Sequence, residues 1–208
     1  LVETVSPDTG TTRFLYDGAG NLVRKIEDAA GTARSTLYSY DGLDRLTAID
    51  LPNDPDWVFT YDTSAASNQK GRLASVSNGV VTTQLEYTQR GDVAVERTIV
   101  DGLSYAVQYA YDAAGNRTQV QGPSGTQAVT SYAGLRPSGM TVTAGTHTQQ
   151  VTHLTWYPFG LRTQAKFPPQ SGGTNTVTST RSVNLRGQIT DVDVTSGAAA
   201  ILDRQTFY

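Results

Sequence analysis

The 208-residue sequence contains no cysteine. This absence excludes disulfide frameworks, thiolate metal sites and cysteine nucleophiles, and it leaves the redox environment undetermined. The sequence also lacks an uninterrupted apolar run of about 18 residues, which a membrane-spanning helix requires. Residues 1–4 show neither the basic nor the apolar region of a secretory signal. We therefore expect no membrane span and no Sec signal within this sequence.

An excess of charge of one sign is also missing. The 16 Lys and Arg residues oppose 19 Asp and Glu residues, so the net charge is −3. No segment gathers the basic residues that binding to a phosphate backbone requires, which argues against nucleic acid as a partner. By contrast, 11 Tyr and 20 Gly accompany abundant Thr and Val. This composition favours strands and turns, so we expect an all-β protein.

A short motif recurs along the chain and determines the expected fold. Residues 16–22 read Tyr-Asp-Gly-Ala-Gly-Asn-Leu, and residues 111–117 read Tyr-Asp-Ala-Ala-Gly-Asn-Arg. Degraded copies lie between and after these two, and the copy at Tyr61 carries an inserted loop, residues 63–70. The anchor positions of the copies, 21 to 27 residues apart, are Tyr16, Tyr40, Tyr61, Tyr87, Tyr111, Tyr132, Trp156 and Val183, with Tyr208 opening a ninth copy.

Each anchor precedes a predicted turn. Asp17 can accept backbone N–H bonds at the start of a type I turn, and Gly20 can adopt the left-handed conformation that follows. Asp112 and Gly115 repeat this arrangement. The other positions assigned to these turns are Asp41, Asp62, Gly91, Gly160 and Gly187. A second turn signal follows in each copy, at Gly31, Asn53–Asp56, Asn78-Gly79, Asp101-Gly102, Ser124-Gly125, Ala144-Gly145, Gly172-Gly173 and Ser196-Gly197.

Between the turns, large side chains alternate with a period of two, as at Tyr105, Val107 and Tyr109. This spacing places them on one face of each strand. Two strands in each of about eight copies predict roughly sixteen antiparallel strands, and so wide a twisted sheet should curl. The strand after each anchor turn breaks the alternation, so we expect β-bulges there.

The Tyr-Asp-x-x-Gly-Asn-Leu motif, with an aromatic two residues before it and a spacing of about 24 residues, resembles the YD or Rhs repeat. Residues 38–41, Tyr-Ser-Tyr-Asp, followed by Arg45-Leu46, resemble the variant that closes with Arg-Leu. The resemblance runs from about Phe14 to Tyr208 and is most specific in the first five copies. It implies a β-strip that spirals into a hollow shell, as in bacterial Rhs polymorphic toxins, the B and C components of Tc toxins, and teneurins.

The resemblance also implies a biological setting. In the bacterial members, the shell encloses a C-terminal toxin before delivery, so the implied partners are the rest of the shell and that enclosed domain, and the implied location is secreted or cell-surface. Toxin-bearing members share an Asp-Pro-x-Gly-Leu segment at which self-cleavage releases the cargo. This sequence lacks that segment, so we expect no autoproteolysis here. We regard residues 1–208 as one repeat segment, expected to be a fragment of a larger shell.

Several residues could suggest chemistry, but a simpler explanation exists for each. His147 and His153 have no further ligands nearby for a metal. The turn at Asn53–Asp56 lacks the glycine and the distal Glu of an EF-hand loop. The acid pairs Glu27-Asp28 and Asp191/Asp193 are best explained as solvated charges rather than as glycosidase carboxylates. No catalytic motif occurs, so we assign no catalytic, metal-binding or cofactor-binding residue and expect no enzyme and no cofactor.

Two functions remain open from the sequence. The first is structural encapsulation of a polypeptide cargo by a β-shell. The alternative is an extracellular adhesion surface that binds glycans or a protein through exposed aromatic side chains. Because the tyrosines recur at fixed positions, we expect them to pack between neighbouring hairpins.

Overall fold

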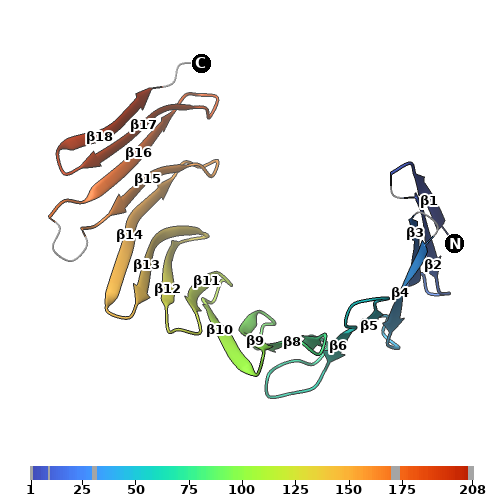
Figure 1. The fold of residues 1–208 in the computed structure, drawn as a ribbon. Helices are drawn as coiled ribbons and strands as arrows, with labels where there is room; N and C mark the ends of the chain where they lie inside the picture. Colours follow the sequence, from blue (N-terminus) through green and yellow to red (C-terminus); the bar gives the residue numbers. More distant parts are fainter. Residues whose placement is uncertain (1, 9, 30–31, 170–173, 206–208) are drawn as a thin grey trace. The chain divides into compact units, whose positions relative to one another are not determined.

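The computed structural model describes residues 2–8, 10–29, 32–169 and 174–205. In these residues the chain forms eighteen strands and no helix (Figure 1). None of the described segments is a helix that could cross a membrane. The strands are β1 (Val2–Ser6), β2 (Gly10–Tyr16), β3 (Leu22–Ala29), β4 (Thr32–Tyr40), β5 (Leu46–Asp50), β6 (Trp57–Tyr61), β7 (Leu73–Ser77), β8 (Val81–Tyr87), β9 (Val93–Val100), β10 (Leu103–Tyr111), β11 (Arg117–Gln121), β12 (Gln127–Ala133), β13 (Arg136–Ala144), β14 (His147–Trp156), β15 (Arg162–Phe167), β16 (Val177–Val183), β17 (Ile189–Ser196) and β18 (Ala199–Gln205).

The chain divides into two units, residues 1–106 and residues 107–208. The first unit contains β1 to β9 and the beginning of β10, and the second contains the rest of β10 and the strands up to β18. In each defined register, a strand pairs antiparallel with its neighbour in the sequence. The predicted all-β fold of tandem antiparallel hairpins is therefore confirmed. There are more strands than the expected sixteen because residues 2–16 form a hairpin ahead of the first turn.

A β-bulge lies beside each anchor. Leu15 pairs with Arg24 whereas Tyr16 pairs with Leu22, so Val23 is an extra residue on the strand after the turn. The bulge explains why the alternation of side chains fails there and confirms the bulges expected from the sequence. The equivalent register shifts precede Tyr40, Tyr61, Tyr87, Tyr111, Tyr132, Trp156 and Val183.

The second turns close the other end of the hairpins. Asp101 and Gly102 have φ angles of 51° and 73°, and positive values at both central residues are what a type I′ turn requires. At the preceding second turn, the N–H of Asn78 donates to the carbonyl of Val81 at 3.1 Å. The second-turn positions Gly31 and Gly172-Gly173, and the ninth anchor Tyr208, lie outside the described residues.

Little side-chain surface is fully buried in either unit. Among the described residues, the buried ones are Ala74, Ala165 and Gln69, with exposed fractions of 3%, 0% and 6%. The contacts recorded between strands join consecutive strands, so within the described part no second layer packs on the sheet of either unit. Cohesion therefore depends on what each hairpin shares with its neighbour, as in other repeat proteins.

Candidate functional site at the repeat turns

The turn after an anchor is closed by the side chain of the next residue. Asp17 Oδ1 accepts hydrogen bonds from the N–H groups of Ala19 and Asn21 at 2.9 and 2.8 Å. Asp41 and Asp112 accept the equivalent pair of bonds at 2.9 to 3.0 Å. The short carboxylate thus satisfies two amides that the turn leaves without backbone partners.

These bonds stabilise the ionised carboxylates. The pKa of Asp17 is lowered mainly by the backbone N–H of Asn21. The pKa of Asp112 is lowered mainly by the side-chain amide of Asn116, which donates to Asp112 Oδ2 at 2.8 Å. A carboxylate that accepts several N–H bonds holds its negative charge more firmly than a solvated one. The turns at Asp17 and Asp112 therefore favour the ionised aspartate.

The fourth residue of the turn has the left-handed backbone conformation that the sequence predicted for it. Gly20 has a φ angle of 94°, and its N–H donates to the carbonyl of Asp17 at 3.3 Å. In the second copy, Asp44 occupies this position with a φ angle of 58°. Aspartate tolerates this region better than most residues other than glycine. The remaining assigned glycines have φ angles of 100° at Gly91, 88° at Gly115, 99° at Gly160 and 78° at Gly187.

Five anchor rings in the described residues are hydrogen-bonded to the preceding repeat. The hydroxyl of Tyr40 donates to the carbonyl of Leu22 at 2.9 Å, and Leu22 is the residue that pairs with Tyr16 at the previous bulge. Burial raises the pKa of Tyr40 because it disfavours the phenolate. The equivalent bonds run from Tyr61 to Leu46 at 2.9 Å, from Tyr87 to Leu73 at 2.8 Å, from Tyr132 to Arg117 at 3.0 Å, and from Trp156 Nε1 to Pro137 at 2.7 Å.

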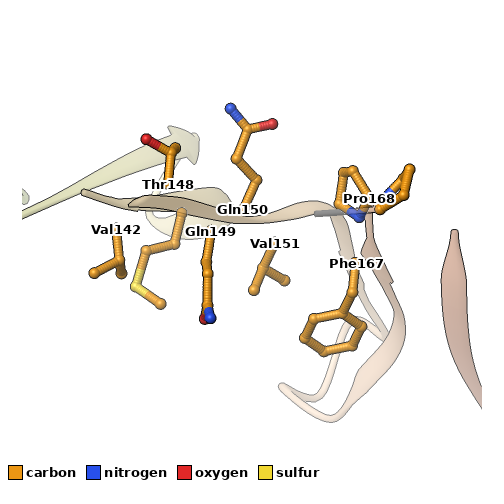
Figure 2. Close-up of a pocket in the computed structure, with 9 residues that line it drawn as sticks. Val142, Thr148, Gln149, Gln150, Val151, Phe167 and Pro168 are labelled. Atoms are coloured by element: carbon orange, nitrogen blue, oxygen red, sulfur yellow. The ribbon is translucent and has the colours of Figure 1, made fainter. Parts of the chain in front are cut away.

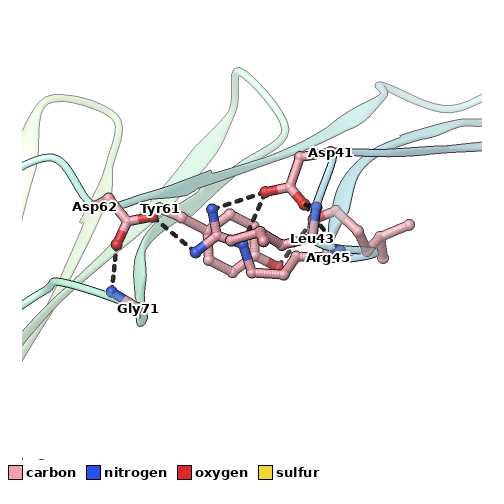
Figure 3. A network of polar contacts seen from close by, with 7 residues as sticks. Asp41, Leu43, Arg45, Tyr61, Asp62 and Gly71 are labelled. Atoms are coloured by element: carbon pink, nitrogen blue, oxygen red, sulfur yellow. Dashed lines mark hydrogen bonds and ion pairs between the residues drawn. The ribbon is translucent and has the colours of Figure 1, made fainter.

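A guanidinium group joins two consecutive turns in the first unit. Arg45 donates through Nε to Asp41 Oδ2 and through Nη1 to Asp62 Oδ2, both at 2.7 Å (Figure 3). Its Cζ also lies 4.3 Å from the centroid of the Tyr61 ring, within the range of a cation–π contact. Arg45 therefore links the second copy to the third through both the aspartate and the anchor. Sequence analysis did not assign it, although the Arg-Leu closing pair was the available signal.

The carboxylates at this junction are held in the ionised form. The pKa of Asp41 is lowered mainly by the backbone N–H of Arg45. The pKa of Asp62 is lowered mainly by the N–H of Gly71, with a further contribution from the Arg45 guanidinium. At the junction before, an amide links the two turns, because Asn21 Nδ2 donates to Asp44 Oδ1 at 2.8 Å.

The inserted loop of the third copy packs onto the fourth. Gln69, which is 6% exposed, donates through Nε2 to the carbonyl of Leu85 at 2.6 Å. Asn68 Nδ2 donates to the carbonyl of Tyr87 at 2.8 Å, and the N–H of Tyr87 donates to the carbonyl of Ser67 at 3.0 Å. The loop therefore holds the end of β8 through both the N–H and the carbonyl of Tyr87.

The last copies replace parts of the motif. Val183 has no polar side-chain atom and therefore cannot form the anchor bond. Asn184 stands in the place of the aspartate, and its Oδ1 accepts from the N–H groups of Arg186 and Gln188 at 2.9 and 3.1 Å. The Arg136 guanidinium donates to the carbonyls of the turn at residues 157–158. Side-chain hydrogen bonds therefore still stabilise and link the turns in the copies whose motif has changed.

The surface hollows near these strands offer little catalytic chemistry. One of about 360 Å³ has a lining of mixed polarity (Figure 2). The lining residues that the structure describes, none of which is ionisable, are Met140, Val142, Thr148, Gln149, Gln150, Val151, Phe167, Pro168 and Pro169. Another lies beside Arg45 and Asp62, whose charges pair with each other. Within the described residues, no group of three His, Cys, Asp or Glu side chains could hold a metal ion.

The other candidate residues from the sequence differ in their surroundings. Asp56 Oδ1 accepts from the N–H of Leu51 at 3.0 Å, which makes the segment 53–56 a turn stabilised by its own side chain. Glu27 forms an ion pair with Lys25 at 2.7 Å. Asp28 and Asp191 each have a buried Oδ1 without a hydrogen-bond partner, so the expectation that both acid pairs are solvated was wrong for these two oxygens. Asp193 engages another group. Within the described residues, neither pair belongs to a group of three His, Cys, Asp or Glu side chains that could hold a metal ion.

Comparisons with known proteins agree with this geometry. The RHS Repeat family model matches residues 16–56 and 96–127. No curated protein matches the sequence. Solved structures that are similar to this chain include the following three. The crystal structure of TcdB2-TccC3-Cdc42 has 16% sequence identity and a TM-score of 0.82 over 100% of this chain, and that of TcdB2-TccC3 has 15% identity and a TM-score of 0.82 over 99%. The Photorhabdus luminescens Tc holotoxin pore has 16% identity and a TM-score of 0.81 over 99% of this chain.

The chain corresponds to 11% of the length of each of these structures. At this level of identity the likeness shows a shared fold. The residues that the family model matches include the turns at Asp17, Asp41 and Asp112, whose side-chain bonds are described above. The family model, the turn geometry and the fold therefore agree, and residues 16–56 and 96–127 of this chain match the RHS Repeat.

Proposed function

We propose that this segment is part of the wall of a β-shell in a secreted or delivered bacterial toxin, and that the shell sequesters a C-terminal polypeptide cargo. The observation that carries the proposal is the set of five links from an anchor to the repeat before it, such as Tyr40 to Leu22 and Tyr61 to Leu46. These links extend a sheet hairpin by hairpin without a shared core. A single-layer sheet of this kind suits a wall better than a compact binding domain.

The comparisons support the same setting. The similar solved structures are of Tc toxin components and of a Tc holotoxin pore, in which a stretch of each chain has the fold of this segment. We infer from them that the partners of this chain are further shell repeats and an enclosed toxin domain. Its mechanism would be exclusion of proteases from the cargo.

In this proposal no residue of the segment performs chemistry. The charged side chains at the turns are committed to structural bonds, as Asp41, Arg45 and Asp62 illustrate. The alternative of glycan recognition receives no support, because the rings of Tyr40, Tyr61 and Tyr87 that it would use are bonded to neighbouring repeats through their hydroxyls.

The test is limited proteolysis of the full-length polypeptide that contains these repeats. The C-terminal region should resist proteinase K in the unmodified protein. A variant with Tyr40, Tyr61 and Tyr87 all replaced by alanine should lose three links between repeats and should expose that region to faster cleavage. The matched control is Tyr38→Phe, which leaves those links in place.

Two results would overturn the proposal. One is rapid cleavage of the C-terminal region in the unmodified protein. The other is an identical cleavage rate in the triple variant, provided that hydrogen exchange shows its repeats to be opened.

A further inference from the structure

A second irregularity interrupts β14, away from its anchor turn. Thr152 pairs with Lys166 and Thr155 pairs with Gln164, so three residue positions along β14 correspond to two along β15. The bulge contains His153, which has a φ angle of 51°. This left-handed conformation is uncommon for a residue other than glycine and costs free energy. A bulge also redirects the side chains next to it.

The bulge lies on the wall of a hollow of about 430 Å³ within the second unit. Lys166 is opposite Thr152 on one side and opposite Thr178 on the other, so the three side chains share one face of the sheet. Thr152, His153, Lys166 and Thr178 all line the hollow, together with Thr176. The Thr152 hydroxyl is 3.1 Å from His153 Nδ1.

The hollow presents hydrogen-bond donors and positive charge without an acid to neutralise them. Its lining contains no Asp or Glu, and Lys166 forms no ion pair among the residues that the structure describes. Asp193 and Asp191 on β17 pair with Thr180 and Ser182, which lie two and four residues along β16 from the threonine beside Lys166. The charge of Lys166 therefore remains available.

We infer that this hollow binds a small oxyanion such as phosphate or sulfate. Lysine has three donors and no acceptor, threonine hydroxyls can donate, and a protonated imidazole donates from both nitrogens. Charge-assisted bonds from such groups are the strong ones for oxyanions. The strained conformation of His153 serves to bring the imidazole to the same hollow as Lys166. The inference does not depend on the proposed shell function, because it concerns a local site on β14 to β16.

The experiment is an NMR titration of the isotopically labelled chain with sodium phosphate, and separately with sodium sulfate, at constant pH and ionic strength. Saturable shifts are expected in the amide signals of Thr152, His153, Lys166 and Thr178. The Lys166→Gln variant should weaken the apparent Kd about tenfold or more, since hydrogen bonds to charged groups are worth that much.

Two further variants sharpen the test. His153→Asn removes the imidazole but retains a residue that tolerates the left-handed conformation, and it should also weaken binding. Lys70→Gln removes a lysine from the first unit and should leave the titration unchanged. The proposed site would be overturned by non-saturable shifts or by full affinity in Lys166→Gln or His153→Asn. An equal loss of affinity in Lys70→Gln would also overturn it. Spectra that match the unmodified chain outside residues 150–180 show that each variant is folded.

Discussion

Replacement of Tyr40 by phenylalanine tests whether the anchor hydroxyl holds one repeat to the next. The substitution keeps the ring and removes the hydroxyl that donates to the carbonyl of Leu22 at 2.9 Å. A hydrogen bond of this kind contributes about 0.5 to 1.5 kcal/mol net, and an acceptor left without a partner in a half-buried place adds to the loss. We expect Tyr40→Phe to lower the free energy of unfolding by about 1 kcal/mol.

The assay is urea denaturation followed by tyrosine fluorescence and circular dichroism. With a slope of about 2 kcal/mol per molar urea, a loss of about 1 kcal/mol lowers the midpoint by about 0.5 M. Because repeat proteins can unfold in parts, hydrogen exchange should accompany the denaturation curve. The increase in exchange should concentrate in β3 and β4, on the two sides of the broken bond.

Tyr38→Phe is the matched control. Tyr38 lies two residues earlier in β4, opposite Ile49, and no hydrogen bond of its hydroxyl occurs among the described residues. Its loss should change the free energy of unfolding by less than about 0.5 kcal/mol, as expected for a substitution that breaks no specific contact. If Tyr40→Phe and Tyr38→Phe give the same midpoint, the anchor hydroxyl does not join the repeats and the reasoning fails.

Three further predictions follow from the same contacts. The stabilisation from Asp17 and Asp112 should be complete above about pH 4, because the unfolded carboxyls have a pKa near 3.9, and it should be lost as the pH falls through their lowered folded pKa values. Urea midpoints from pH 7 to pH 2.5 measure this loss. Asp112→Asn should show a smaller decline in midpoint than the unmodified chain. Gly91→Ala should lower the free energy of unfolding by more than about 1 kcal/mol, because Gly91 has a φ angle of 100° and an added Cβ would lie 2.6 Å from Nη2 of Arg72. The control is Gly42→Ala, because nothing lies within 4 Å of its added Cβ. Equal urea midpoints for the two variants would contradict the claim. Gln69→Ala should lower the free energy of unfolding by about 1 to 3 kcal/mol, since it leaves the carbonyl of Leu85 without its donor, and it should speed hydrogen exchange at Tyr87. The control Ser67→Ala should leave this exchange unchanged. Unchanged exchange in Gln69→Ala would show that the loop does not hold β8.

Short-range features of this protein could be predicted from the sequence. The Asp17 and Asp112 turns involve residues no more than four apart, and alternation at Tyr105, Val107 and Tyr109 involves neighbours along one strand. Local side-chain chemistry and backbone conformation decide such features. The broken alternation after each turn likewise indicated the bulges, because an extra residue on one strand shifts every later side chain to the other face.

The acceptor of each anchor hydroxyl could not be predicted in the same way. Tyr40 and Leu22 are 18 residues apart, and their contact depends on how one hairpin lies against the previous one. The same is true of Arg45, which reaches Asp62 at a separation of 17 residues. The recurrence of tyrosine, rather than phenylalanine, at the anchors was a signal that the hydroxyl had a partner, but it did not identify that partner.

The inserted loop and the bulge at His153 illustrate a further limit. The sequence shows that residues 63–70 are additional, but only the structure shows that Gln69 and Asn68 bind the backbone of β8. The sequence alone therefore determined the repeat, its turns and the all-β class, because these depend on interactions between residues close in the chain. Tertiary structure alone decided which groups join the repeats and which side chains meet in a hollow, because those contacts depend on the register and twist with which successive hairpins lie side by side.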